Sequence, residues 1–123
     1  MKNLLFAVAI CVCTTAVTAQ EFKIVTTIES VVPGGLGRSR MIQTDDSGKS
    51  QEVKMQNYFS MVGINFGNIT ENDQMIALML GDMTSKGWEL ITTTPGVYSA
   101  DKSTGLFITR YVFKRDTGDY PGE

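Results

Sequence analysis

Histidine is absent from the 123-residue chain, and its two cysteines, Cys11 and Cys13, both lie near the start. Most transition-metal sites, and most Ser-His, Cys-His and dithiol mechanisms, need one of these two residue types. Residues 20–123 therefore lack the usual ligands and partners for that chemistry. We expect no metal site, no cofactor and no enzymatic activity.

The chain also lacks a large excess of either charge. It has 11 Lys+Arg against 13 Asp+Glu, a net charge of −2 at pH 7. Nucleic-acid-binding domains usually carry a strongly basic field, so a nucleic-acid partner is excluded. The hydrophobic fraction of 42% and the charged fraction of 20% are ordinary for a folded protein. A chain of this length forms one domain.

The start of the chain has the features of a secretory signal peptide. Lys2 supplies a positive charge, residues 4–12 form an apolar stretch, and small residues precede a cleavage point after Ala19. The apolar stretch is shorter than the ~20 residues that span a bilayer. We therefore expect residues 1–19 to be cleaved, and the mature chain to be periplasmic or secreted without stable membrane insertion.

Alternation of apolar and polar side chains predicts β-strands. In the first strand, Phe22, Ile24 and Ile28 lie on the more apolar face, and Val25 is the one apolar residue on the other face. Pro95-Gly96 is expected to end the strand after the helix. The predicted strands are residues 21–31, a hairpin over about 38–62 with its turn at 45–49, and strands at about 88–94 and 105–115.

A helix is predicted at about residues 71–86. Thr70 resembles an N-cap, and Gly87 is expected to stop the helix in the left-handed conformation. One apolar stripe must face the sheet, and it consists of Met75, Ile76, Met79, Leu80 and Met83. The predicted fold is α+β, an antiparallel sheet of four to five strands with one amphipathic helix on one face. Residues 20–115 form this domain, and residues 116–123 are a flexible tail.

Three segments resemble the small bacterial family of unknown function catalogued as DUF4177. They are residues 22–25, the Gly-Trp-Glu-Leu-Ile segment at 87–91, and the Tyr-Val-Phe-Lys-Arg segment at 111–115. The resemblance implies a compact α+β domain without an established activity, and it assigns no functional residues. The position of Trp88 directly after the helix stop indicates an anchor between helix and sheet rather than a ligand-stacking ring.

A glycine-rich loop at residues 34–40 is one candidate binding site. Its backbone N–H groups, with Arg38, Ser39 and Arg40, could bind a carboxylate, sulfate or phosphate. The loop lacks the lysine of a P-loop and leads into a strand rather than a helix. A connecting loop with solvated arginines is the alternative.

The last strand has apolar residues on both faces, so we expect it either to lie centrally in the sheet or to meet a partner with the face away from the helix. The residues predicted for this surface are Glu89, Ile91, Ile108, Arg110 and Val112. A homodimer or another envelope protein would cover them, so we expect a non-enzymatic binding domain. One rival is an anion carrier that uses the 34–40 loop. The other is a small enzyme that uses carboxylates, with candidates Glu29, Glu89, Lys54 and Tyr58, although nothing in their spacing brings a pair together.

Overall fold

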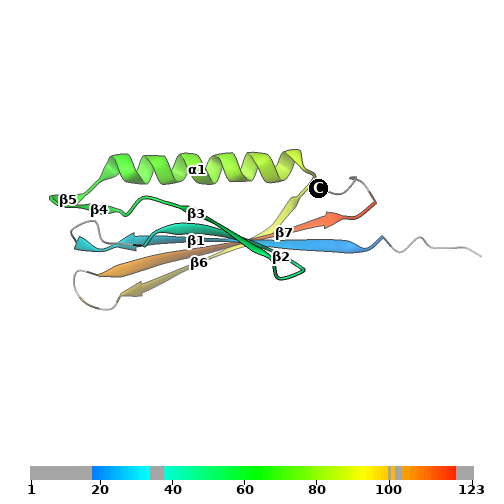
Figure 1. Ribbon diagram of the computed structural model, residues 1–123, viewed down its shortest axis with the longest axis horizontal. Coiled ribbons are helices and arrows are strands. Elements are labelled where there is room, and N and C mark those ends of the chain that lie inside the picture. The colour runs from blue at the N-terminus through cyan, green and yellow to red at the C-terminus, as the bar shows by residue number, and fades with distance from the viewer. Residues whose placement is uncertain (1–17, 34–37, 100, 102–103, 119–123) are drawn as a thin grey trace, which may run out of the picture.

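The computed structural model describes residues 18–33, 38–99, 101 and 104–118. A five-stranded antiparallel sheet in the order β3-β2-β1-β7-β6 carries one helix on one face, with a small hairpin, β4-β5, beside the start of the helix (Figure 1). The α+β prediction is confirmed. The predicted signal peptide lies outside the described residues apart from Thr18 and Ala19. The elements are β1 (Gln20–Val31), β2 (Arg40–Asp45), β3 (Ser50–Lys54), β4 (Phe59–Ser60), β5 (Gly63–Ile64), α1 (Phe66–Ser85), β6 (Glu89–Ser99) and β7 (Gly105–Asp116).

The end of α1 follows the prediction. Gly87 has a φ of 79°, which glycine adopts without the steric cost of a side chain. The N–H of Gly87 donates to Thr84 O at 3.1 Å, and the N–H of Trp88 donates to Met83 O at 3.0 Å. These two bonds form a Schellman motif, which satisfies carbonyls at the helix end and places the indole directly over the last turn.

The start of α1 differs from the prediction. The N-cap is Asn65, whose side chain accepts from the N–H of Asn68 at 3.2 Å, and the helix begins at Phe66. Thr70 lies inside the helix, where its hydroxyl donates to Phe66 O at 3.0 Å. The side chain of Asn68 also donates to Asn57 O at 2.7 Å. This bond ties the additional first turn to the preceding loop, which explains why the earlier cap prevails.

The strand after the helix is longer than predicted. β6 passes through Pro95 and Gly96, which pair with Thr109 and Ile108 of β7. Because β6 is an outer strand of the sheet, a residue without an N–H is tolerated there. The last strand also extends one residue into the segment predicted as a tail, because Asp116 belongs to β7 and pairs with Gln20. Residues 119–123 lie outside the described part of the chain.

The predicted hairpin over residues 38–62 is correct only in its first half. β2 and β3 pair around the turn at 45–49, but β3 ends at Lys54. After it, Met55 is buried, and the side-chain amide of Asn57 donates to Val32 O at 2.9 Å and to Phe59 O at 2.7 Å. These bonds anchor the chain outside the main sheet, so it continues as the separate hairpin β4-β5.

The hydrophobic core lies between α1 and the sheet. Its buried members are Val25, Met41, Met55, Met79, Met83, Trp88 and Phe113. The methionine stripe of α1 thus faces the sheet as predicted. β1 presents its less apolar face to the helix, with Val25, Thr27 and Glu29. Phe22 and Ile24 lie on the other face and are 44% and 41% exposed. The more apolar face of the first strand is therefore the face that the helix leaves uncovered.

Candidate functional site

The three residues predicted for the 34–40 loop have different surroundings. Ser39 is buried, and its hydroxyl oxygen accepts from the N–H of Ser30 at 2.8 Å, which gives it a structural contact. Arg40 Nη1 donates to Glu52 Oε2 at 2.8 Å. Arg38 is exposed beside them in a shallow depression of about 330 Å³. Residues 34–37, which would supply the backbone donors, lie outside the described residues.

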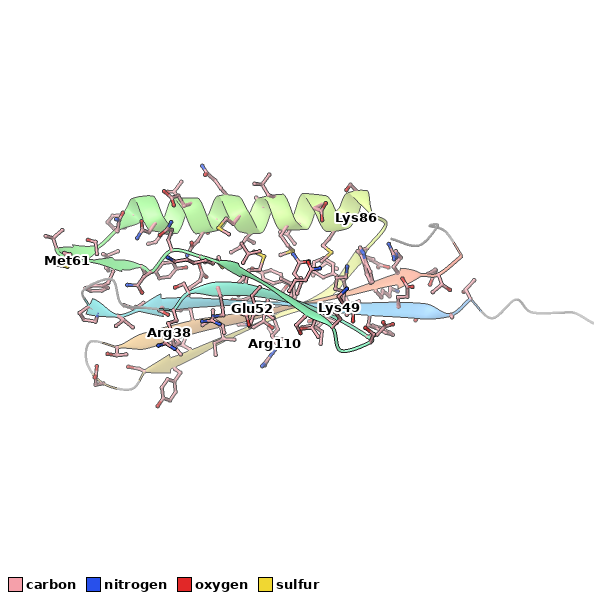
Figure 2. The ribbon with its side chains drawn as sticks, in the orientation of Figure 1. Arg38, Lys49, Glu52, Met61, Lys86 and Arg110 are labelled. Atoms are coloured by element: carbon pink, nitrogen blue, oxygen red, sulfur yellow. The ribbon has the colours of Figure 1, made fainter. Side chains whose placement is uncertain are left out.

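The residues predicted for the sheet surface lie largely together. Strand register puts Ile108, Arg110 and Val112 of β7 on the face away from α1, and Figure 2 shows Arg110 projecting from that side. Glu89 Oε2 pairs with Lys114 Nζ at 3.3 Å on the same face. Ile91 is the exception, because it lies in the irregularity between Leu90 and Thr92 and has no register partner.

The structure adds residues that the sequence prediction missed. In the register, Ile24 lies opposite Val112, and Ile28 lies opposite Ile108. We call the sheet face away from α1 the open face; its apolar members on β1, β2 and β7 are Phe22, Ile24, Ile28, Ile42, Leu106, Ile108 and Val112. The alternation in β1 was visible in the sequence. It did not indicate which face the helix would cover, so these residues were not joined to the predicted surface.

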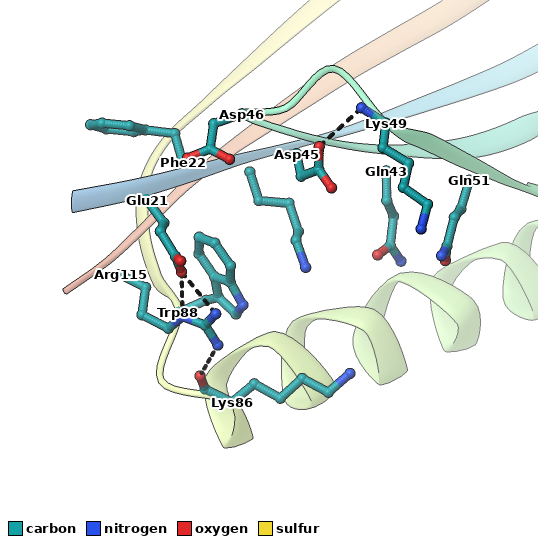
Figure 3. A pocket seen from close by; sticks show the side chains of 11 residues that line it. Glu21, Phe22, Gln43, Asp45, Asp46, Lys49, Gln51, Lys86, Trp88 and Arg115 are labelled. Atoms are coloured by element: carbon teal, nitrogen blue, oxygen red, sulfur yellow. Dashed lines mark hydrogen bonds and ion pairs between the residues drawn. The ribbon is translucent and has the colours of Figure 1, made fainter. Parts of the chain in front are cut away.

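A second feature is a cleft of about 480 Å³ between the last turns of α1 and the end of the sheet (Figure 3). Most of its lining is polar. The lining residues are Glu21, Phe22, Lys23, Gln43, Asp45, Asp46, Lys49, Gln51, Lys86, Trp88 and Arg115. Only Trp88 among them was given a specific role from the sequence, because the lining combines residues of β1, β2, β3 and β7 with the turn at 45–49 and the segment just after α1, which only the fold brings together.

Trp88 forms the inner wall of this cleft and is 6% exposed. Lys23 Nζ lies 4.7 Å from the centre of its ring, and Arg115 Cζ lies 4.4 Å from it, both within cation–π distance. Arg115 also donates to Glu21 Oε2 from Nε at 3.1 Å and from Nη2 at 2.8 Å, and from Nη1 to Lys86 O at 3.1 Å. The prediction that Trp88 anchors helix to sheet agrees with this geometry.

The carboxylate of Asp45, at the rim of the cleft, accepts its hydrogen bonds from the turn that follows it. It accepts from the Ser47 hydroxyl at 2.6 Å, from the Ser47 N–H at 3.1 Å and from the Lys49 N–H at 2.9 Å. The hydrogen bond from the Ser47 hydroxyl is the main reason why the pKa of Asp45 is lowered, since it stabilises the charged form.

A buried polar cluster lies under the first half of α1. Asn72 is fully buried and donates from Nδ2 to Glu29 Oε1 at 3.0 Å. Burial, followed by the neighbouring Glu29, raises the pKa of Tyr58 above its usual range, and burial likewise raises the pKa of Tyr111. Of the four residues named for a carboxylate enzyme, the fold brings together Glu29 and Tyr58. Glu89 lies on the open face, as does Lys54, which pairs with Arg40.

Among residues 18–33, 38–99, 101 and 104–118, no group of three or more His, Cys, Asp or Glu side chains is arranged to hold a metal ion. The described part of the chain also contains no helix that is both long and apolar enough to cross a membrane.

Comparison with known proteins adds no relative. No protein-family model, no curated protein and no solved structure matches the chain significantly. The resemblance to DUF4177 therefore stays a prediction.

Proposed function

We propose that this chain is an exported, non-enzymatic binding domain that self-associates through its open face. The observation that carries the proposal is the group of apolar side chains on the sheet face opposite α1, in which Phe22 and Ile24 are 44% and 41% exposed and Ile28, Ile42, Ile108 and Val112 are partly exposed. Apolar side chains gathered on one face, rather than scattered singly, mark an interaction site. Export follows from the predicted leader, and cleavage after Ala19 would leave every described element intact because β1 begins at Gln20.

The size of the open face suits a second copy of the same chain. At about 4.8 Å between strands and about 3.4 Å per residue, the five strands cover roughly 750 Å² of sheet plane. A standard interface buries about 800 Å² on each partner. Two copies packed face to face about a two-fold axis would supply this area from one self-complementary surface, as in other β-sandwiches.

The charges on the open face also suit burial against a copy. Arg40 pairs with Glu52 near one corner of the sheet, and Lys114 pairs with Glu89 near the opposite corner. Because these charges are already neutralised within one chain, a partner need not supply compensating charges for them. Arg110 lies between the two corners and can keep its charged end at the rim of the interface while its methylene groups cover apolar surface.

The test measures molar mass by light scattering for the mature chain and two variants. Ile24→Glu places a charge in the centre of the open face, so it is expected to convert the dimer to a monomer. Leu78→Glu is the matched control, because Leu78 is 73% exposed on α1, away from that face; it should remain dimeric. A wild-type chain that stays monomeric at its highest soluble concentration would overturn the proposal, and so would an Ile24→Glu variant that is folded and still dimeric.

A further inference from the structure

The turn of the β4-β5 hairpin exposes two apolar side chains. Met61 and Val62 form the two-residue turn between Ser60 and Gly63, and they are 87% and 97% exposed. Tight hairpin turns favour glycine, asparagine, aspartate and serine, so a methionine and a valine contribute nothing to the turn itself. Positions that break a local rule without a structural gain are where a function is expected.

The hairpin projects from one end of the molecule and is held at its base. Figure 2 shows Met61 at that end, beyond the first turn of α1. The N–H of Asn65 donates to Tyr58 O at 2.8 Å, and the N–H of Tyr58 donates to Ser30 O at 2.9 Å. These bonds fix the base of the hairpin to the start of α1 and to β1, so the turn is presented outward on a rigid support.

Two more apolar residues extend the exposed surface of the hairpin. Ile64 and Phe66 follow the turn and are 57% and 76% exposed. We call these two residues, together with Met61 and Val62, the apolar tip. The run from residue 55 to residue 70, which contains the tip, has no Asp, Glu, Lys or Arg. Such a surface can leave water without the desolvation cost of a charged group.

We propose that the apolar tip inserts into the interfacial region of a lipid bilayer. Its four side chains expose less area than the about 800 Å² that a standard protein interface buries on each partner. A lipid surface needs no complementary shape, and aliphatic and aromatic side chains gain by transfer from water into its apolar boundary. The contact is peripheral and reversible, because the tip reaches only that boundary.

The surface behind the tip also suits a bilayer. Phe59, Val97 and Phe107 line a shallow depression of about 240 Å³ where β4 meets the end of β6 and the start of β7. Val97 is 71% exposed and Phe107 is 40% exposed. Asp101 lines the same depression, and its carboxylate accepts from the N–H of Thr104 at 2.7 Å. Once the tip has entered the bilayer, these side chains would meet the headgroup region, where aromatic residues are favoured.

The inference does not depend on self-association, because β4-β5 forms a sheet of its own, apart from the open face. The first experiment measures co-sedimentation of the mature chain with phosphatidylcholine vesicles, and with vesicles that also contain phosphatidylglycerol. We expect saturable binding to phosphatidylcholine that added phosphatidylglycerol does not strengthen, because the tip has no basic residue to attract an anionic headgroup.

A pair of exposed positions locates the contact. Val62→Asp should weaken vesicle binding about tenfold or more, since the transfer of one valine side chain from water is worth about this factor. Leu78→Asp is the matched control, because Leu78 is 73% exposed on α1, away from the tip, and this variant should bind as the wild type does. Both positions are exposed, so both variants should fold.

A tryptophan at the turn reports insertion directly. The emission of Val62→Trp should move to shorter wavelength with phosphatidylcholine vesicles, and lipid brominated near the headgroup end of its acyl chains should quench it. The wild-type chain is the control, because its single tryptophan, Trp88, is 6% exposed and should not respond.

Four results would overturn the inference. These are a wild-type chain that does not sediment with phosphatidylcholine vesicles, binding that requires phosphatidylglycerol, unchanged binding by Val62→Asp, and an equal loss of binding by Leu78→Asp. The first of these would favour a protein groove as the occupant of the tip. Light scattering tests the remaining alternative, a second copy of the chain. The molar mass of Val62→Asp should equal that of the wild type, and a lower value would assign the tip to a contact between copies instead.

Discussion

Asn72 connects three parts of the chain through one side-chain amide. Its Oδ1 accepts from the N–H of Gln56 at 2.8 Å, and its Nδ2 donates to Gln56 O at 2.9 Å and to Glu29 Oε1 at 3.0 Å. Because the residue is fully buried, these bonds replace water for both backbone groups of Gln56. Asn72 therefore holds the segment after β3 against α1, a role that a polar residue inside a helix does not reveal in the sequence.

Replacing Asn72 with alanine should lower the free energy of unfolding by about 2–4 kcal/mol, because it leaves buried polar groups without partners. Urea denaturation followed by circular dichroism measures this. Gln74→Ala is the control, since Gln74 is exposed on the same helix and its loss should change stability by less than about 0.5 kcal/mol. Similar midpoints for the two variants would contradict the role given to Asn72.

At the scale of elements, two glycines near α1 differ in what the structure requires of them. Nothing in the structure requires a glycine at Gly81, inside the helix, whereas Gly87, just after it, has a backbone conformation that favours glycine. A Cβ added at Gly81 would meet no atom within 4 Å, so Gly81→Ala should stabilise the chain by about 0.5–1 kcal/mol. Gly87 has a φ of 79°, so Gly87→Ala should destabilise it by about 1 kcal/mol or more. The melting temperature should therefore rise for Gly81→Ala and fall for Gly87→Ala, although both variants add the same methyl group. A lowered melting temperature for Gly81→Ala would show that helix propensity does not govern this site.

The same elements show what sequence patterns could predict. The methionine spacing of α1 and the Gly87 stop are local signals, and both were sufficient to place the helix and its end. The start of α1 depends on the bond from Asn68 to Asn57 in a neighbouring loop, which no local pattern contains. The length of β6 depends on its place at the sheet edge, because only there is Pro95 tolerated. These errors arise where tertiary contacts override local preference.

The candidate sites follow the same rule. The alternation in β7 identified half of the open face, including Ile108 and Val112. The other half, in β1 and β2, required knowledge of which face the helix covers. The cleft at Trp88 could not be predicted, because its lysines come from three separate parts of the chain, with Lys23 in β1, Lys49 before β3 and Lys86 after α1.

Across the whole molecule, several polar side chains are buried and several apolar side chains are exposed, which is the reverse of the usual distribution. The interior between helix and sheet holds Thr27, Glu29 and Asn72, all buried, whereas the opposite sheet face exposes an apolar strip. A chain that functioned as a monomer would gain by placing the apolar strip under the helix. Covering the strip would remove its apolar side chains from water, which supports the proposed self-association.

The polar interior makes stability sensitive to alkaline pH. The pKa of Tyr58 and that of Tyr111 are raised from 10.0, chiefly by burial and also by the nearby Glu29. Below pH 10 these tyrosines are protonated in both the folded and the unfolded chain, so their contribution to stability is fully present. As the pH rises above 10, the unfolded chain releases these protons first, and the free energy of unfolding falls until the folded chain also ionises.

Tyr58→Phe should therefore make the decline in stability above pH 10 shallower, as measured by urea denaturation over a series of alkaline pH values. Tyr98→Phe is the control. Tyr98 is 61% exposed, and it lies opposite Leu106 on the open face, away from Glu29. Ultraviolet titration of the folded protein should show tyrosines that ionise late, and fewer of them in the Tyr58 variant. Equal slopes for wild type and Tyr58→Phe would mean that the hydroxyl of Tyr58 is solvated in solution. The cluster under α1 would then be open to water at its Tyr58 end.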